Sequence, residues 1–174
     1  MRVAHRGVAG IARGRALSAD NENPRLGTGG TWVIGIYRAL VAAGLDEAEA
    51  REWTARANWH VYEKIAALAA KLAALGSAPP LDRAQRTMRL FFRFPYAAPG
   101  HAVEEVDAGK ECFGFDIRRC AMADFLVAQG LPELCQQACR DLDFPLADSW
   151  GTRLEVRQTI SRGADRCTFR FFAK

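Results

Sequence analysis

The chain has 174 residues, a length typical of one domain, and is 49% hydrophobic and 25% charged, as ordinary globular proteins are. No apolar run approaches the roughly 20 residues needed to span a bilayer, so the sequence predicts no membrane partner. The net charge of +4 is modest and no groove-reading motif accompanies it, so we expect no nucleic-acid partner. Five cysteines without small-scaffold spacing are typical of reduced thiols, which favours a cytoplasmic protein.

The first 30 residues predict a flexible basic arm. Glycines alternate there with arginine, asparagine and proline, so the segment has little apolar surface to bury. It also lacks the continuous apolar stretch of a secretory signal. We therefore expect residues 1–30 to be a solvated tail and residues 31–174 to form a single α+β domain.

Two helices are predicted in the first half of that domain. The first begins near Thr31 and stops before Gly44. The second opens at Asp46 and Glu49, which form a capping-box pair, and ends at Gly76. Its apolar residues recur every three or four positions and predict its buried face: Trp53, Ala57, Val61, Ile65, Leu68, Leu72 and Leu75.

A hairpin is the next clear pattern after the ambiguous residues 82–94, which begin like a helix and finish like a strand. Alternating residues flank a turn at 107–110, and Phe113, Phe115 and Ile117 should share the buried face of the second strand. The hairpin adds the first strands to the predicted domain.

The last third continues with two short helices, over 120–129 and from Pro132 onward. A closing hairpin is predicted between residues 154–160 and 167–172, which both alternate. The predicted fold is therefore α+β, with N-terminal helices packed on an antiparallel sheet that ends in a C-terminal β-hairpin.

The cysteines allow three interpretations. Cys135 and Cys139 lie one turn apart on a predicted helix and so face the same side, where Cys120 and Cys167 could join them. Four thiolates are a zinc-ligand set, but the tight C-x2-C pairs of structural zinc sites are missing, and buried cysteines commonly just pack as small hydrophobes. Cys120 is also a candidate nucleophile, because two arginines precede it and a helix begins there. We predict no metal site.

Other polar residues also have two interpretations each. Asp141 and Asp143 follow Cys139 at a predicted helix end, where they are either general bases or carboxylates paired with nearby arginines. Arg157 shares one strand face with Glu155, so it belongs either to an outward salt-bridged surface or to a site that binds a carboxylate. Neither a serine nucleophile elbow nor an HExxH motif is present.

A set of these residues in the last third carries a family resemblance. The set comprises Arg119-Cys120, the GLPEL stretch at 130–134, Cys139, the DFPLA run from Asp143, Arg157, Thr159, Gly163, and the C-x-F-R-F ending from Cys167. Together these residues resemble the L-2-amino-thiazoline-4-carboxylic acid hydrolase family. The similarity is good over residues 95–174, and over 31–94 it extends only to helical character.

The resemblance implies a cofactor-free hydrolase of cysteine metabolism. Its substrate would be a small heterocyclic amino acid of the 2-amino-thiazoline-4-carboxylate type, opened at a C–N or C–S bond to a carbamoyl-cysteine. We hypothesise that Asp143 is the base, that Cys139 is the acid or nucleophile and that Arg157 binds the substrate carboxylate. Cys120, Thr159 and Cys167 would line the pocket. A homo-oligomer is compatible with the sequence.

The same ending is also similar to small-ligand-binding domains related to 4-vinyl reductase and to aromatic-sensing regulators. Those domains close with a glutamate and two cysteines before a C-x-hydrophobic strand, and some bind zinc. Thr159 stands at about the place of one of those cysteines, which argues against a metal here. The alternative function is thus a binding or sensing module without turnover, with an aromatic-lined pocket in place of converging polar groups.

Overall fold

The computed structural model describes residues 24–75 and 78–174, so residues 1–23 of the predicted arm lie outside the described part. The first helix, α1, spans Pro24–Ala42 and thus begins earlier than the predicted start at Thr31. The second and longest, α2, spans Glu47–Ala73. It opens as predicted, because the Asp46 carboxylate accepts a hydrogen bond of 2.8 Å from the backbone N–H of Glu49. None of the described helices is long and apolar enough to cross a membrane.

The remaining elements alternate between strand and helix. They are α3 (Pro80–Phe91), β1 (His101–Asp107), β2 (Cys112–Cys120), α4 (Ala121–Ala128), α5 (Pro132–Cys135), the π-helical turn η1 (Gln136–Arg140), α6 (Asp141–Ser149), β3 (Thr152–Val156), the 3-10 turn η2 (Ile160–Arg162) and β4 (Cys167–Ala173).

Two local predictions need correction. Residues 82–94 do not finish as a strand, because the helical hydrogen bonding of α3 continues past its end, from the N–H of Phe92 to the carbonyl of Met88. Asp141 and Asp143 lie in the first turn of α6 rather than at a helix end, since the chain stays helical from α5 through η1 into α6. A carboxylate is unfavourable only in the last turn of a helix, so the helix dipole does not disfavour Asp141 and Asp143 at their observed position.

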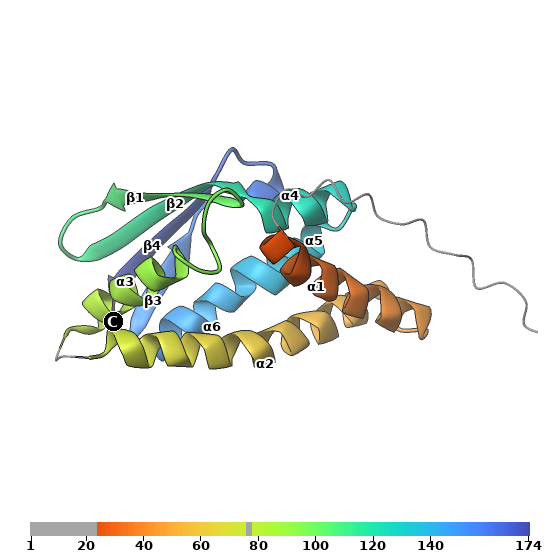
Figure 1. The fold of residues 1–174 in the computed structure, drawn as a ribbon, viewed down its shortest axis with the longest axis horizontal. Coiled ribbons are helices and arrows are strands. Elements are labelled where there is room, and N and C mark those ends of the chain that lie inside the picture. Colours follow the sequence, from red (N-terminus) through yellow and green to blue (C-terminus); the bar gives the residue numbers. More distant parts are fainter. Residues whose placement is uncertain (1–23, 76–77) are drawn as a thin grey trace, which may run out of the picture.

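The four strands form one antiparallel sheet in the order β1-β2-β4-β3, which confirms the α+β fold class. Both predicted hairpin pairings are present, β1 with β2 and β3 with β4, and β2 pairs with β4 to join them. The long helix α2 and the helix α6 run along one side of the sheet, with α1 beyond its end (Figure 1).

The core has two parts. The first lies between the sheet and the helices α2, α3 and α6, and includes Phe113, Phe115 and Ile117, whose predicted burial is confirmed. The second joins α1, α4 and α5. Cys120, at the end of β2, packs against both. A pocket opens at the junction between the two cores.

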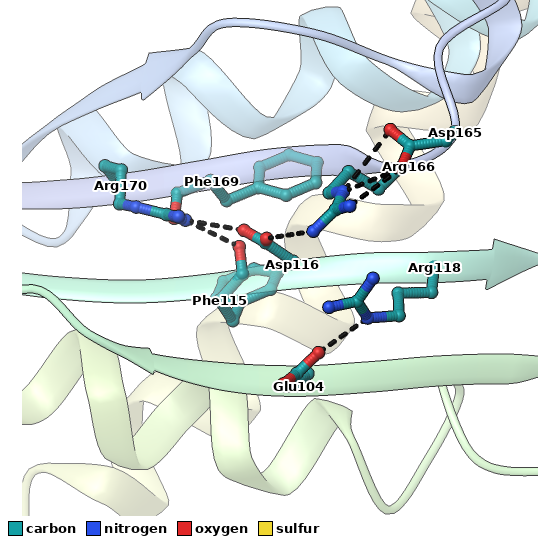
Figure 2. A network of polar contacts seen from close by, with 8 residues as sticks. All are labelled: Glu104, Phe115, Asp116, Arg118, Asp165, Arg166, Phe169 and Arg170. Atoms are coloured by element: carbon teal, nitrogen blue, oxygen red, sulfur yellow. Dashed lines mark hydrogen bonds and ion pairs between the residues drawn. The ribbon is translucent and has the colours of Figure 1, made fainter.

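The opposite face of the sheet carries a charged network (Figure 2). Asp116 in β2 accepts a hydrogen bond of 2.9 Å from Arg170 in β4, and its second oxygen lies 3.7 Å from Arg166. Arg170 also donates to the backbone carbonyls of Phe115 and Phe169. These bonds cover a carboxylate that is only 6% exposed and connect the two central strands across their outer surface.

The predicted buried stripe of α2 is wrong. Its large members, from Trp53 to Leu75, are exposed, and the helix packs instead through small residues: Ala50, Thr54, Ala66, Ala69 and Ala73. Small side chains let the axis of α2 approach its neighbours closely, which explains why the alanine face is the inner one. The helix is rotated relative to the prediction, so Asn58 and Tyr62 line the pocket as well as Val61 and Ile65 of the predicted stripe.

Candidate active site

A cavity of about 560 Å³ lies between the two parts of the core. Its walls come from α2, the loop after α3, the ends of β1 and β2, the run from α5 to α6, and the segment from η2 into β4. Most of the lining is apolar, with aromatic rings that include Tyr62, Tyr96 and Phe115. The volume and lining suit a small organic molecule.

Of the six predicted site residues, five line this cavity: Cys120, Cys139, Asp143, Thr159 and Cys167. They are far apart in sequence and are brought together because β2, η1, α6, η2 and β4 converge at one end of the sheet. The sixth, Arg157, is not brought to the cavity. Its side chain is 78% exposed and lies 3.7 Å from the carboxylate of Glu155, which is the outward salt-bridged alternative.

Asp143 is the carboxylate of the cavity. It lies in the first turn of α6 and is half-buried. Burial raises its pKa to about 8, with a further increase from the neighbouring Asp141 and a partial opposing effect from Arg140. A carboxyl group that titrates near neutral pH can exchange a proton with a substrate.

Cys135, the last residue of α5, and Cys139, on η1, both line the cavity. The wide turn is supported from α2, because the side chain of Asn58 donates a hydrogen bond of 2.7 Å to the carbonyl of Ala138. The two thiols are hydrogen-bonded to each other, which lowers the pKa of Cys135. The same bond, together with burial, holds the pKa of Cys139 well above its ordinary value, so Cys139 is a protonated thiol at neutral pH.

Cys120 forms a pair with His101 that the sequence did not reveal. The Sγ of Cys120 lies 3.6 Å from Nε2 of His101, since the first residue of β1 pairs with the last of β2. The backbone N–H of Ala123 also donates to this sulfur at 3.4 Å. Burial raises the pKa of Cys120 to about 12 and lowers that of His101, so both groups are neutral.

Thr159 and Cys167 form the opposite wall. The hydroxyl of Thr159 accepts a hydrogen bond of 2.9 Å from the amide of Gln136, which also bonds to Ser161. The sulfur of Cys167 accepts from the backbone N–H of Ile160 at 3.3 Å, and burial raises its pKa to about 11. Gln136 of η1 thus holds the Thr159 side chain, and the backbone at the start of η2 holds that of Cys167.

Several other polar residues of the cavity were missed from the sequence. Tyr62 of α2 and Tyr96 share a hydrogen bond of 2.8 Å between their hydroxyls, and burial raises the pKa of both. Tyr62 and Asn58 were missed because the wrong face of α2 was predicted to be buried. Arg93 and Arg140 are the two cations of the lining. Arg140 bonds to Asp141 at 2.7 Å, whereas Arg93 has no ion pair among the described residues.

In residues 24–75 and 78–174, no group of three or more His, Cys, Asp or Glu side chains is arranged to hold a metal ion. The five cysteines are all free thiols. The cavity therefore offers proton donors and acceptors: one carboxyl, four thiols, hydroxyls, an imidazole and two guanidinium groups. Such a set suits acid–base chemistry on a small substrate.

Comparison with models of known protein families shows the family to which the chain belongs. The model of the L-2-amino-thiazoline-4-carboxylic acid hydrolase family matches residues 31–171. The chain belongs to this family. The match includes every residue of the cavity, and it extends the resemblance of the last third back through α2 and most of α1. No match was found among curated proteins or among solved structures.

Proposed function

We propose that this member of the L-2-amino-thiazoline-4-carboxylic acid hydrolase family opens a 2-amino-thiazoline-4-carboxylate ring in the 560 Å³ cavity and releases a carbamoyl-cysteine. One observation carries the proposal: a carboxyl group whose pKa is raised to about 8 and a protonated thiol line the same cavity. Free thiols at all five cysteines fit a reducing, cytoplasmic setting.

The reaction adds one water across the ring. Water attacks the carbon between nitrogen and sulfur, and the resulting tetrahedral centre expels one of these two atoms. Breaking the C–N bond leaves the carbamoyl group on sulfur and frees the amine, whereas breaking the C–S bond leaves it on nitrogen and frees the thiol. Either route needs a base that takes a proton from water and an acid that protonates the leaving atom.

In this proposal Asp143 is the base and Cys139 is the acid. A base is most effective when its pKa is close to the working pH, which a value of about 8 satisfies. Cys139 keeps its proton at that pH, which favours the acid role over that of nucleophile. After one turnover Asp143 holds a proton and Cys139 lacks one, and exchange with water restores both.

Substrate binding is assigned to the other side chains of the cavity. Cys120, Thr159 and Cys167 would contact the ring. We transfer the carboxylate-binding role from Arg157 to Arg93, because Arg93 lines the cavity and has no ion pair among the described residues. A guanidinium group binds a carboxylate through two parallel hydrogen bonds.

A sensing module without turnover is the second candidate. The aromatic lining favours it, because rings from Trp32, Tyr62, Tyr96, Phe115 and Phe169 could surround a flat apolar ligand. Such a module would hold a ligand and leave it unchanged, and the polar groups of the cavity would serve only for orientation.

Turnover separates the two candidates. Purified protein is incubated with 2-amino-thiazoline-4-carboxylate, with and without a chelator, and the thiol or carbamoyl product is followed. The proposal predicts turnover that the chelator leaves unchanged. Ligand binding without product would support the sensing module, and turnover lost on chelation would point to a metal held by the cysteines.

A further inference from the structure

Two phenol groups meet in the wall of the cavity, one from Tyr62 of α2 and one from Tyr96 in the loop after α3. Their hydroxyl oxygens are 2.8 Å apart. The two hydroxyls carry two protons, but the bond between them uses only one. Within residues 24–75 and 78–174, neither oxygen forms any other hydrogen bond. One O–H of the pair is therefore free to donate to a molecule in the cavity.

Packing holds the pair in place. Both rings lie against the buried ring of Phe91, with centroid distances of 5.9 Å for Tyr62 and 6.1 Å for Tyr96. The backbone N–H of Tyr96 also donates a hydrogen bond of 2.8 Å to the carbonyl of Phe91, which ties the loop to the end of α3. A donor that is fixed before the reaction needs no reorganisation when charge develops beside it.

Tyr62 is the member of the pair that faces the reactive groups. It lies one turn after Asn58 on the same face of α2, and the Asn58 side chain bonds to the carbonyl of Ala138, the residue before Cys139. The Tyr62 ring is therefore directed toward the run from η1 into α6, which carries Cys139 and Asp143.

The titration of the two phenols agrees with this placement. Burial, followed by the negative charge of Asp143, raises the pKa of Tyr62, and burial also raises that of Tyr96, so both phenols keep their protons. The bond between them lowers the pKa of Tyr62 and raises that of Tyr96, as expected when Tyr96 donates and Tyr62 accepts. The O–H of Tyr62 is then the free donor.

The proposed ring opening needs such a donor. Asp143 takes one proton from the attacking water, Cys139 gives one to the leaving atom, and the second proton of the water ends on the ring nitrogen. The oxygen of the water stays on the ring carbon and carries negative charge while the tetrahedral centre collapses to the carbamoyl group. A hydrogen-bond donor aimed at that oxygen stabilises the transition state.

We propose that Tyr62 is a catalytic residue that donates a hydrogen bond to this oxygen, and that Tyr96 is a positioning residue that holds the Tyr62 hydroxyl. Neither tyrosine transfers a proton. The inference rests on the proposed function. The substrate lacks this oxygen before water attacks, whereas the carbamoyl product retains it, so Tyr62 should contribute to kcat and to product binding but not to substrate binding.

The first test compares kcat and KM for phenylalanine variants, which keep each ring and remove only the hydroxyl. Tyr62→Phe should lower kcat at least about 100-fold and leave KM nearly unchanged. Tyr96→Phe should lower kcat by less. Tyr37→Phe is the matched control, because Tyr37 is buried in the second part of the core and does not line the cavity, and it should change neither value. A larger loss in Tyr96→Phe than in Tyr62→Phe would overturn the assignment of Tyr62 as the donor.

The second test is calorimetric binding of N-carbamoyl-cysteine, which needs no turnover. Tyr62→Phe should bind this product about two- to tenfold more weakly than the parent, the effect of one lost hydrogen bond. A parent that turns over, with kcat and product binding both unchanged in Tyr62→Phe, would overturn this inference and leave the proposed function standing. A parent without turnover whose product binding is weakened by Tyr62→Phe would contradict the proposed function and retain the donor. A parent that neither turns over nor binds the product would overturn both.

Discussion

The sulfur of Cys120 lies 3.6 Å from Nε2 of His101, yet the pair is neutral rather than a thiolate and an imidazolium. Burial raises the pKa of the thiol to about 12 and lowers that of the imidazole, so both shifts oppose proton transfer. The first prediction is therefore that Cys120 reacts slowly with iodoacetamide at pH 7.5, since only the thiolate attacks. Mass spectrometry of peptides after timed labelling measures this. Rapid labelling of Cys120 would instead identify it as a nucleophile activated by His101.

The pH dependence of turnover follows from the pKa of Asp143. If Asp143 is the base, kcat/KM should rise about tenfold per pH unit below a pKa near 8 and then level off. The fall caused by loss of the acid should come at higher pH, because the pKa of Cys139 is well above its ordinary value. A profile that is flat between pH 6 and 9 would remove Asp143 from the mechanism.

Asp143 should also make stability depend on pH. Between about pH 4 and 8, the folded chain keeps a proton on Asp143 that the unfolded chain has lost. The free energy of unfolding then falls as pH rises, by at most about 1.4 kcal/mol per pH unit. Asn cannot ionise, so Asp143→Asn should be more stable relative to the parent at pH 8 than at pH 5. Urea unfolding at both values measures the difference, and an unchanged difference would mean that the carboxyl is not held in its protonated form.

The substrate carboxylate provides a test of Arg93. Arg93→Ala should raise KM about tenfold or more, since a charged hydrogen bond contributes about 1.5–3 kcal/mol. Arg157→Ala is the matched control and should change KM little, because that side chain is outside the cavity. With 2-amino-thiazoline, which lacks the carboxylate, the parent and Arg93→Ala should behave alike. Equal effects of the two arginine variants would argue against a specific clamp.

A stability prediction concerns the outer face of the sheet. A Cβ atom on Gly114 would lie 2.9 Å from Cδ of Arg170, whose guanidinium is held by Asp116 and two carbonyls. Gly114→Ala should therefore displace Arg170 and lower the free energy of unfolding by about 1–3 kcal/mol. Gly35→Ala, on an exposed position of α1 with nothing within 4 Å, should instead stabilise by about 0.5–1 kcal/mol. Denaturant titration distinguishes the two.

Much of the fold could be predicted because its patterns are local. Alternation identified the strands that bury Phe113 and Phe115, and Asp46 with Glu49 marked the start of α2. The rotation of α2 could not be predicted from hydrophobicity, because close packing selected its alanines over its leucines. The larger apolar side chains of the predicted stripe, such as Leu68 and Leu72, are therefore exposed in the described structure.

The candidate site could be predicted only for residues whose side-chain type is itself reactive and which belong to a family pattern. Asp143 and the cysteines were recognised as reactive types within a family pattern, and the cavity includes them. The pairing of Cys120 with His101 depends on the register of β1 against β2, which the sequence alone does not specify. Arg157 was chosen for its charge, but β3 ends at Val156, just before it, and the side chain points to solvent.

The most direct test of the proposed mechanism is turnover of 2-amino-thiazoline-4-carboxylate by Asp143→Asn beside Asp141→Asn. Both variants remove a carboxylate from the first turn of α6, but only Asp143 lines the cavity. Loss of a general base predicts a decrease in kcat of at least about 100-fold for Asp143→Asn, with little change for Asp141→Asn. Full activity of Asp143→Asn, or equal losses in both variants, would contradict the assignment of Asp143 as the base.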